Sequence, residues 1–434
     1  MIPLLAALAA GPVTDTAITY MVGGVRVIQQ VDTGTRLAAA GIYFLGGTAM
    51  LTPTTAGVED LLIHAAARGS RRYPLDGGTR ALARTGAIET IDVEEDWTAL
   101  WLEGFASDFD SSWAVMADQV VAPMLSDSLV NRARMDLLAA AQARYYDPEQ
   151  RIRALAESVM FAGHPYAMDP RGNPTSLAAL TPDAVRQFQH REMVGSRMLL
   201  VVVGNVSRER LTALVTATLG TVPAGNYHWI MPLPLPYREA ARGSRWVVEN
   251  RPLPTTYILG YCTGPQPGDP SYWPFRIANR LYSGLVFDAV RGRGLSYAAG
   301  AAFLDRAMPV GGFEMSTPAP DQAFPLALAA LEELTNLNVS SIQDDESSAR
   351  WFFFTRQVRR EFLAELRQAQ STVLGTVDVL ARAQLFFGDY RQVSQLLPST
   401  SAFDGQHLSN AASACRTRME YAFLGDSTRM NGKW

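Results

Sequence analysis

Two side chains that can bind a metal ion stand four residues apart in "GVEDLLIHAAARGS" (residues 57–70), where they are Asp60 and His64. On a helix, residues at this spacing lie on one face, so both side chains could reach the same ion. Imidazole nitrogens and carboxylate oxygens are ordinary zinc ligands, and a further carboxylate beside them could take a proton from zinc-bound water. The residue before His64, however, is Ile63. The stretch therefore holds part of a hydrolytic zinc site without its base.

The elements that would position this stretch follow one another in the same order twice. Strand patterns at residues 18–30 and in "RLAAAGIYFLGG" precede it, helical patterns cover about residues 108–160, and the apolar strand "RMLLVVVGNV" closes the series. The second series has a strand in "TTYILGYC", a helix in "SYWPFRIANRLYSGLVFDAV", strands in "LSYAAGAAFL" and "VGGFEMSTPA", helices from Phe324 to about Leu397, and a strand in "RMEYAFLGDST". This order predicts an α+β fold with two homologous halves, each a mostly antiparallel sheet with helices packed on one face.

Two stretches outside these series suggest how the chain is divided. Residues 1–14 are a short apolar run that ends in small residues and lacks a basic leading region, so they are interpreted as a possible signal remnant. Residues 222–244 contain four prolines and no helical period, which is typical of a linker. The predicted halves are therefore residues 15–221 and residues 245–434.

Composition narrows the class of protein. The formal net charge is −4 and no basic stripe is present, so a nucleic-acid partner is not expected. No run approaches the roughly 18 apolar residues that a transmembrane helix needs. Cys262 and Cys415 have neither the number nor the spacing of a disulfide framework or metal site, so both are expected to be ordinary, partly buried thiols.

Several stretches, taken in order, resemble the pitrilysin/insulinase family of zinc metallopeptidases, in particular its short, processing-peptidase-like branch. "GGVRVIQQ" resembles the family's opening N-G-L-R-V strand, "TAGVEDLLIHAAARGS" its G-x-x-H-x-x-E-H helix, and "VRGRGLSY" its R-x-x-R-G-L-x-Y segment. "DWTALWLE", "GHPYAMDPRGNPTSLAALTPDAVRQF" and "VVVGNV" resemble landmarks between them. The resemblance covers nearly the whole chain and implies the family's clamshell of two α+β halves.

The resemblance also implies which residues stand at the zinc site. In the inverted motif H-x-x-E-H, two His and a downstream acid hold zinc, and the Glu is the base. The corresponding positions of this chain, with the downstream acidic pair last, are Asp60, Ile63, His64, Ala139 and Ala140. The nearest downstream carboxylate, Asp136, comes about one turn early. No metal and no independent catalysis are therefore expected in this chain, and His64 is expected to be satisfied by a local hydrogen bond.

The second half keeps more of the family's pattern. The resemblance implies that an Arg and a Tyr of this half hold the substrate carbonyl and stabilise the developing oxyanion, for which guanidinium and phenol donors are suited. Arg291, Arg293 and Tyr297 are the matching residues, and the segment is one residue shorter than usual between its two Arg, so either Arg could have the substrate role. The structural alternative is that Arg291 pairs with a surface acid and Tyr297 packs under a strand.

A degraded metal half beside a preserved Arg/Tyr half implies a catalytically inactive subunit of a heterodimeric zinc peptidase. Its partners would be a homologous zinc-containing subunit, which carries the cofactor, and an unfolded peptide substrate. The N-terminal run favours the bacterial envelope, with the periplasm as the expected compartment and the cytoplasm as the alternative. Other hypotheses are a structural scaffold subunit, as in the core proteins of the respiratory cytochrome bc complex, and a stand-alone peptide-binding protein. "YHWIMPLPLPY" and "WFFF" would then be docking patches rather than linker packing and helix core.

Overall fold

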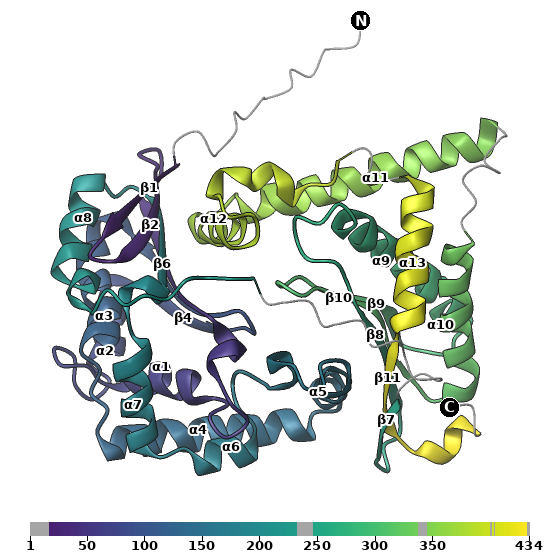
Figure 1. Ribbon diagram of the computed structural model, residues 1–434, viewed down its shortest axis with the longest axis horizontal. Coiled ribbons are helices and arrows are strands. Elements are labelled where there is room, and N and C mark those ends of the chain that lie inside the picture. Colours follow the sequence, from purple (N-terminus) through teal and green to yellow (C-terminus); the bar gives the residue numbers. More distant parts are fainter. Residues whose placement is uncertain (1–16, 232–245, 337–344, 400–401, 403, 432–434) are drawn as a thin grey trace, which may run out of the picture.

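The computed structural model describes residues 17–231, 246–336, 345–399, 402 and 404–431, and only the backbone of residues 345–355. The possible signal remnant and most of the expected linker lie outside these residues. So do the side chains of "WFFF". Figure 1 shows two halves side by side, each built around one sheet.

The first sheet has six strands in the order β1-β2-β6-β3-β5-β4. In chain order they are β1 (Ala17–Val22), β2 (Val25–Val31), β3 (Leu37–Leu45), β4 (Ile88–Val93), β5 (Trp97–Phe105) and β6 (Met198–Gly204). Neighbouring strands are antiparallel except β2 and β6, which are parallel. Every residue of β6 is buried, as its continuous apolar sequence predicts.

Eight α-helices of the first half are described. They are α1 (Val58–Arg68), α2 (Gly77–Thr85), α3 (Phe109–Val121), α4 (Asp127–Tyr146), α5 (Pro148–Met160), α6 (Pro174–Ala179), α7 (Pro182–Glu192) and α8 (Arg208–Ala217). The expected helical region at 108–160 is thus three helices. Asp147 separates the last two because its side chain caps α5, whose first residue is Pro148.

The second sheet has five strands in the order β7-β11-β8-β10-β9. They are β7 (Trp246–Asn250), β8 (Thr256–Thr263), β9 (Ala298–Leu304), β10 (Val310–Thr317) and β11 (Glu420–Gly425). The helices of this half are α9 (Tyr272–Val286), the π-helical turn η7 (Phe287–Arg291), α10 (Pro320–Thr335), α11 (Asp345–Ala369), α12 (Val373–Phe387) and α13 (Gly405–Arg418). Only β7 and β11 are parallel neighbours.

The two sheets share one topology. Strands β2-β6-β3-β5-β4 of the first correspond in order to β7-β11-β8-β10-β9 of the second, and the parallel pair has the same place in both. Strand β1 is an addition at the edge of the first sheet. The predicted α+β fold with two homologous, mostly antiparallel halves is therefore confirmed.

The halves also exchange one helix each. Helix α12 of the second half packs on β3 and β6 of the first sheet, and α5 of the first half packs on β8 and β11 of the second (Figure 1). Val377 and Leu380 of α12 share a buried cluster with Tyr43 and Val201, and Ile152 of α5 shares another with residues of the second sheet. Each sheet therefore has its own helices on one face and a helix of the other half on the opposite face.

The expectation of two free thiols is wrong. Cys262 of β8 and Cys415 of α13 form a disulfide, with their Cα atoms 5.2 Å apart. Both residues are buried. The pair lies 153 residues apart in the sequence, and only the packing of α13 against the second sheet brings the two residues together.

The described part of the expected linker, residues 222–231, has no helix or strand and packs on α12. The indole nitrogen of Trp229 donates a hydrogen bond of 3.0 Å to the carbonyl oxygen of Leu385, while Ile230 is exposed. The described part of "YHWIMPLPLPY" is thus mainly a packed connection. Among the helices that the structure describes, none has the length and hydropathy to cross a membrane.

Candidate functional site

Helix α1 carries the candidate zinc ligands and is held at its start by close backbone packing. It begins at Gly57, which has φ +89°, and a Cβ atom there would lie 2.9 Å from the Cα atom of Gly172. Only glycine fits this backbone conformation without strain. The first turn of α1 therefore lies against the loop that contains Gly172.

A buried ion pair fixes the same turn, and sequence reasoning missed it. Glu59 accepts a hydrogen bond of 2.8 Å from the guanidinium of Arg197, whose Nε also donates to the carbonyl oxygen of Leu45 at 2.8 Å. The side chains of Glu59 and Arg197 are 5% and 1% exposed, so the pair is part of the core. The available signal was helical spacing, because Glu59 stands three residues before the apolar Leu62 and shares its face.

Asp60 and His64 engage each other. Nδ1 of His64 lies 3.0 Å from the carbonyl oxygen of Asp60 and 2.8 Å from its carboxylate oxygen Oδ1. The carboxylate is not aligned as a hydrogen-bond acceptor, so this second contact is electrostatic. The expected local hydrogen bond of His64 is therefore present, and one of its two ring nitrogens is occupied within α1.

The charge of His64 also disfavours metal binding. Burial on its own would lower the pKa of His64, but the carboxylate and carbonyl of Asp60 outweigh burial and raise the pKa above its ordinary value. A histidine ligand must be neutral to bind zinc. Because its pKa is raised, His64 holds its proton more tightly, and a metal ion would have to compete with that proton.

Helix α4 packs on α1 but brings no ligand. Ala139 and Ala140 of this helix are exposed, and the carboxylate of Asp136 forms an ion pair with Arg68 of α1. Farther along α4, Arg144 donates a hydrogen bond of 3.0 Å to the carbonyl oxygen of Gly172. At the positions where the family motif has acidic ligands, α4 therefore has Ala139 and Ala140, and the next charged side chain along the helix is that of Arg144.

The position of the catalytic base has become part of the core. Ile63 is 3% exposed and belongs to the buried cluster beneath the first sheet. The described residues contain no group of three His, Cys, Asp or Glu side chains that could hold a metal ion. Zinc sites in proteins have three or four protein ligands, so the donors at α1 do not fit this ion.

The Arg/Tyr segment of the second half is organised differently. Arg291 ends η7 and lies over the ring of Phe287, with its guanidinium carbon 5.0 Å from the ring centre. Tyr297 is 93% exposed, so it does not pack under a strand. Among the described residues, neither Arg291 nor Arg293 has an acidic partner. The structural alternative for Arg291 and Tyr297 is therefore wrong.

Hydrogen bonds to β10 fix the backbone around Tyr297. The hydroxyl of Ser296 donates to the carbonyl oxygen of Ser316 at 2.6 Å, and that of Thr317 donates to the carbonyl oxygen of Leu295 at 2.6 Å. Tyr297 follows directly after this anchored pair. The segment thus presents an exposed phenol from a backbone that is tied to the sheet.

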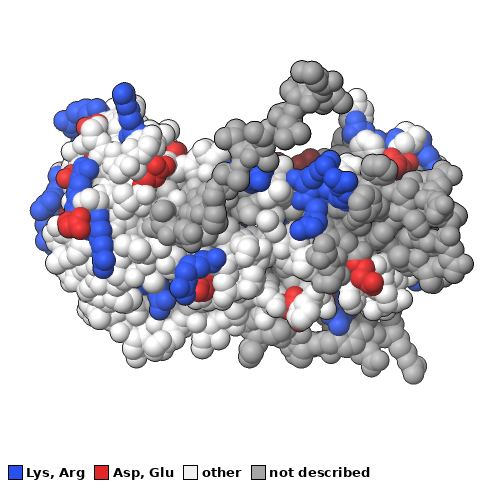
Figure 2. All heavy atoms as spheres, turned by 90° about the horizontal axis from the view of Figure 1, so that it is seen from above, with Lys and Arg blue, Asp and Glu red and all other residues white. Residues whose placement is uncertain are grey.

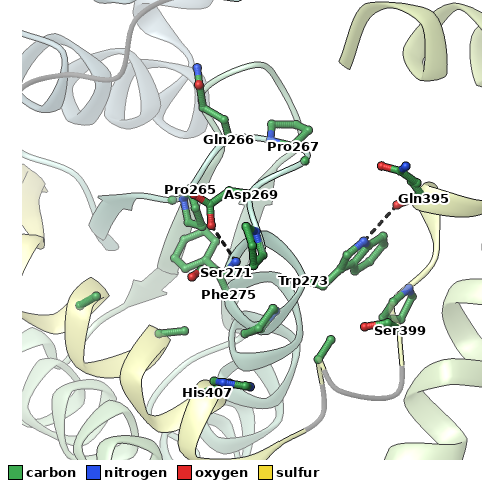
Figure 3. A pocket seen from close by; sticks show the side chains of 18 of the residues that line it. Pro265, Gln266, Pro267, Asp269, Ser271, Trp273, Phe275, Gln395, Ser399 and His407 are labelled. Carbon is green, nitrogen blue, oxygen red and sulfur yellow. Dashed lines mark hydrogen bonds between the residues drawn. The ribbon is translucent and has the colours of Figure 1, made fainter. Parts of the chain in front are cut away.

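A large cavity lies away from both sites. Its volume is about 1290 Å³, and it is lined by the loop between β8 and α9, the first turn of α9, and residues near α12 and α13 (Figure 3). The figure shows the indole of Trp273 directed toward Gln395, whose carbonyl oxygen accepts its hydrogen bond. Arg291 lies beyond the other end of α9, which at 15 residues is about 22 Å long.

Charge is scattered over the surface that Figure 2 shows. Arg side chains form small groups on both halves and lie near Asp and Glu, and the described part of this face has no continuous basic stripe. This face therefore has no electrostatic footprint of the kind that binds nucleic acid.

Two family models match the chain. Residues 26–170 match insulinase (peptidase family M16), and residues 179–346 match the peptidase M16 inactive domain. The first match contains α1 with Asp60 and His64, and the second contains the Arg/Tyr segment.

The curated relatives include two bacterial proteins and one mitochondrial peptidase subunit. An uncharacterized zinc protease of Mycobacterium leprae is 26% identical over 204 residues, which are 47% of this chain and 46% of that protein. One of Streptomyces coelicolor is 22% identical over 64% of this chain and 62% of its own length. The mitochondrial-processing peptidase subunit beta of Saccharomyces cerevisiae is 21% identical over 60% of this chain and 56% of that protein. The matches thus span about half to three-fifths of these relatives.

Solved structures share the fold over nearly the whole chain. A protease from Helicobacter pylori superposes with a TM-score of 0.79 at 14% identity, covering 94% of this chain and 99% of that chain. The peptidase M16 inactive domain from Pseudomonas fluorescens has a TM-score of 0.76 at 16% identity, covering 95% and 98%. The first half of the periplasmic protease PqqL from Escherichia coli has a TM-score of 0.74 at 16% identity, covering 98% and 95%. At these identities the likeness establishes the fold alone.

Proposed function

This chain belongs to the insulinase (M16) family of peptidases, and from that premise we propose that it is a catalytically inactive subunit of a heterodimeric zinc peptidase. In this proposal the chain completes a peptide-binding chamber, and a homologous partner subunit supplies the zinc. The observation that carries the proposal is the state of α1, where the buried Ile63 stands at the position of the base and the neighbouring helix α4 has Ala139 and Ala140 in place of acidic ligands.

The arrangement of α1 supports the inactive role by leaving no route to an activated water. A hydrolytic zinc site needs a neutral ligand set and a proton acceptor beside the water. Here His64 is one ligand of an incomplete set, α4 has Ala139 and Ala140 in place of acidic ligands, and the buried Ile63 supplies no proton acceptor. General-base assistance alone is typically worth about 10²–10⁴-fold, so the loss of the acceptor would matter even if an ion were bound.

The exposure of the Arg/Tyr segment supports a role toward another molecule. An exposed tyrosine on an anchored backbone and two arginines without acidic partners among the described residues can donate hydrogen bonds to a peptide carbonyl or an oxyanion. We propose that Tyr297 and one of Arg291 and Arg293 serve the zinc site of the partner in this way.

Two further observations support a peptide as the ligand and a second chain as the partner. Strands β4 and β9 each end a sheet, so one edge of each is unpaired among the described strands and could accept an extended peptide. The fold of this chain covers 49% of the complete PqqL chain, so that protease has about twice this length in one polypeptide. A heterodimer would supply the same amount of structure from two chains.

The envelope remains the compartment we propose. The disulfide between Cys262 and Cys415 supports it, since structural disulfides persist mainly in oxidising compartments. PqqL, a periplasmic protease, has the same fold.

The test is purification of the chain from its native host, followed by reconstitution with the co-purifying zinc-containing chain. The proposal predicts no peptide hydrolysis by this chain alone and hydrolysis by the mixture. Tyr297→Phe, and one of Arg291→Ala and Arg293→Ala, should lower kcat of the mixture at least 10-fold with assembly intact, since removal of one oxyanion donor costs roughly 10²–10³-fold. Tyr146→Phe and Arg132→Ala, at exposed positions on α4, are the matched controls.

Hydrolysis by the lone chain would contradict the inactive role. Equal loss of activity in the control variants, or none in the Tyr297, Arg291 and Arg293 variants, would contradict the Arg/Tyr role. If the chain co-purifies only as part of a larger complex, and no subunit of that complex cleaves peptides, the result would instead favour a structural scaffold.

A further inference from the structure

The two halves of the chain meet at turns that are equivalent in the duplicated topology. Strands β4 and β5 are joined through Glu94, Glu95 and Asp96, and the corresponding strands β9 and β10 are joined through residues 305–309. The backbone nitrogen of Ala307 donates a hydrogen bond of 2.8 Å to a carboxylate oxygen of Asp96. A backbone group of one half is thus bound directly by a side chain of the other.

Arg306, in the second of these turns, is buried in the first half. Its guanidinium lies 2.8 Å from Glu95 and 3.0 Å from Glu157 of α5, and the side chain is only 7% exposed. The rings of Phe161 and Tyr166 lie 5.1 and 5.0 Å from its guanidinium carbon. One cation of the second half therefore fills a cup of two carboxylates and two aromatic rings from the first.

The rest of the cup is also hydrogen-bonded. The hydroxyl of Tyr166 donates to Asp96, so the residue that binds Ala307 is itself held by a buried neighbour of Arg306. Removing the arginine would leave Glu95 and Glu157 facing each other without their shared cation. Such an unpaired buried charge is strongly unfavourable.

A second arginine binds the same turn from α12. Arg382 donates a hydrogen bond of 3.2 Å to the carbonyl oxygen of Asp305 and pairs with Asp378 at 2.8 Å. Its guanidinium also lies over the ring of Trp97 of β5, with 5.6 Å between the guanidinium carbon and the ring centre. The turn at residues 305–309 is therefore bound directly by the first half through Arg306 and Ala307. It is also bound at Asp305 by Arg382, which lies over Trp97 of the first sheet.

The exchanged helices hold the halves together mainly through apolar burial, to which α5 adds ion pairs of Arg151 with Glu249 and of Arg153 with Glu314. Hydrogen bonds and short ion pairs depend on angle as well as distance. Among these ion pairs between the halves, those of Arg306 are the most deeply buried, so the turn adds a directional constraint to the packing of the helices.

From this geometry we infer that the Arg306 turn is a latch that holds the two halves of the chain in one fixed orientation. The latch itself is a property of the lone chain.

Single-molecule FRET on the isolated, oxidised chain tests the latch. Dyes are attached to Gln187→Cys on α7 and Glu333→Cys on α10, which are exposed positions in different halves. The unmodified latch should give one narrow distribution of transfer efficiency. Arg306→Ala should broaden it or add a second population, while the fold is checked by circular dichroism.

Arg153→Ala is the matched control, because Arg153 also joins the halves, through Glu314 at 2.8 Å, but from a side chain that is 50% exposed. It should leave the distribution unchanged. If Arg306→Ala does not fold, Asp96→Asn combined with Tyr166→Phe keeps the shape of the cup and should still broaden the distribution.

Two outcomes would overturn the latch: several populations in the unmodified chain, or a folded latch variant with the same narrow distribution. Because no partner subunit is present in this experiment, its failure leaves the proposed heterodimer untouched. Failure of reconstitution likewise leaves the latch untouched.

Discussion

The α1 segment and the Arg/Tyr segment lie between corresponding strands of the two halves, β3 and β4 in the first and β8 and β9 in the second, yet they have opposite physical states. In α1 the polar side chains are satisfied within the chain, since Asp60 binds His64 and Glu59 binds Arg197. Around η7, Arg291 contacts only an aromatic ring among the described residues, and Tyr297 is exposed. The polar groups of α1 therefore bind within the chain, whereas the Arg/Tyr segment has exposed donors that can bind another molecule. Stability should therefore depend on the first segment and activity in a complex on the second.

The largest expected effect comes from restoring an acid to the motif. Ile63→Glu places a carboxylate in the core at a residue that is 3% exposed. The free energy of unfolding should fall by about 3–5 kcal/mol, as for an uncompensated buried charge. Urea denaturation measures the change, with Leu75→Glu at a 67% exposed position as the control. An unchanged midpoint would show that Ile63 is not core.

Reducing the disulfide should have the next largest effect and should act on the half that carries the Arg/Tyr segment. Loss of a native disulfide costs about 2–5 kcal/mol. Cys262→Ser combined with Cys415→Ser should lower the thermal midpoint and increase hydrogen exchange in α13 and β8, with less change in the first sheet. Equal loss of protection in both halves would contradict this division.

The pH dependence of α1 should be smaller. Because Asp60 raises the pKa of His64, this contact contributes stability that is fully present below the unfolded pKa and is lost as the pH rises through the folded pKa. The contribution is at most about 1 kcal/mol, since the side chain is 40% exposed. In Asp60→Asn, burial is left to dominate, so an NMR titration should show the pKa of His64 falling below that of the unmodified chain. A rise, or no change, would contradict the proposed coupling.

The smallest effect on stability is expected for the Arg/Tyr segment. Arg291→Ala and Tyr297→Phe should change the free energy of unfolding by less than about 0.5 kcal/mol, as for exposed residues without buried partners. Denaturation curves of the two variants should overlay that of the unmodified chain. A loss above 2 kcal/mol in either would mean that the segment is structural like α1.

The sequence predicted the elements whose pattern is local. Strands β2, β3, β6 and β8 are apolar runs next to glycines or turns. Strand β4 was missed because the apolar residues of "IETIDV" stand at positions 88, 91 and 93, which is not the strict alternation of a half-buried strand. Propensity decides poorly between helix and strand in so short a stretch.

Contacts between distant segments could not be predicted. The exchange of α5 and α12, the Glu59–Arg197 pair and the Cys262–Cys415 disulfide each join residues more than a hundred positions apart. Nothing in the local pattern states which sheet a helix will cover. The motif positions of α1 were found by resemblance, but their mutual satisfaction required the side-chain geometry.

The most direct measurement is a calorimetric titration of the purified, metal-free chain with zinc. If the donors at α1 are as incomplete as their geometry indicates, no tight, stoichiometric binding will be seen, and His64→Ala will titrate like the unmodified chain. One tightly bound zinc per chain, lost in His64→Ala, would contradict the account.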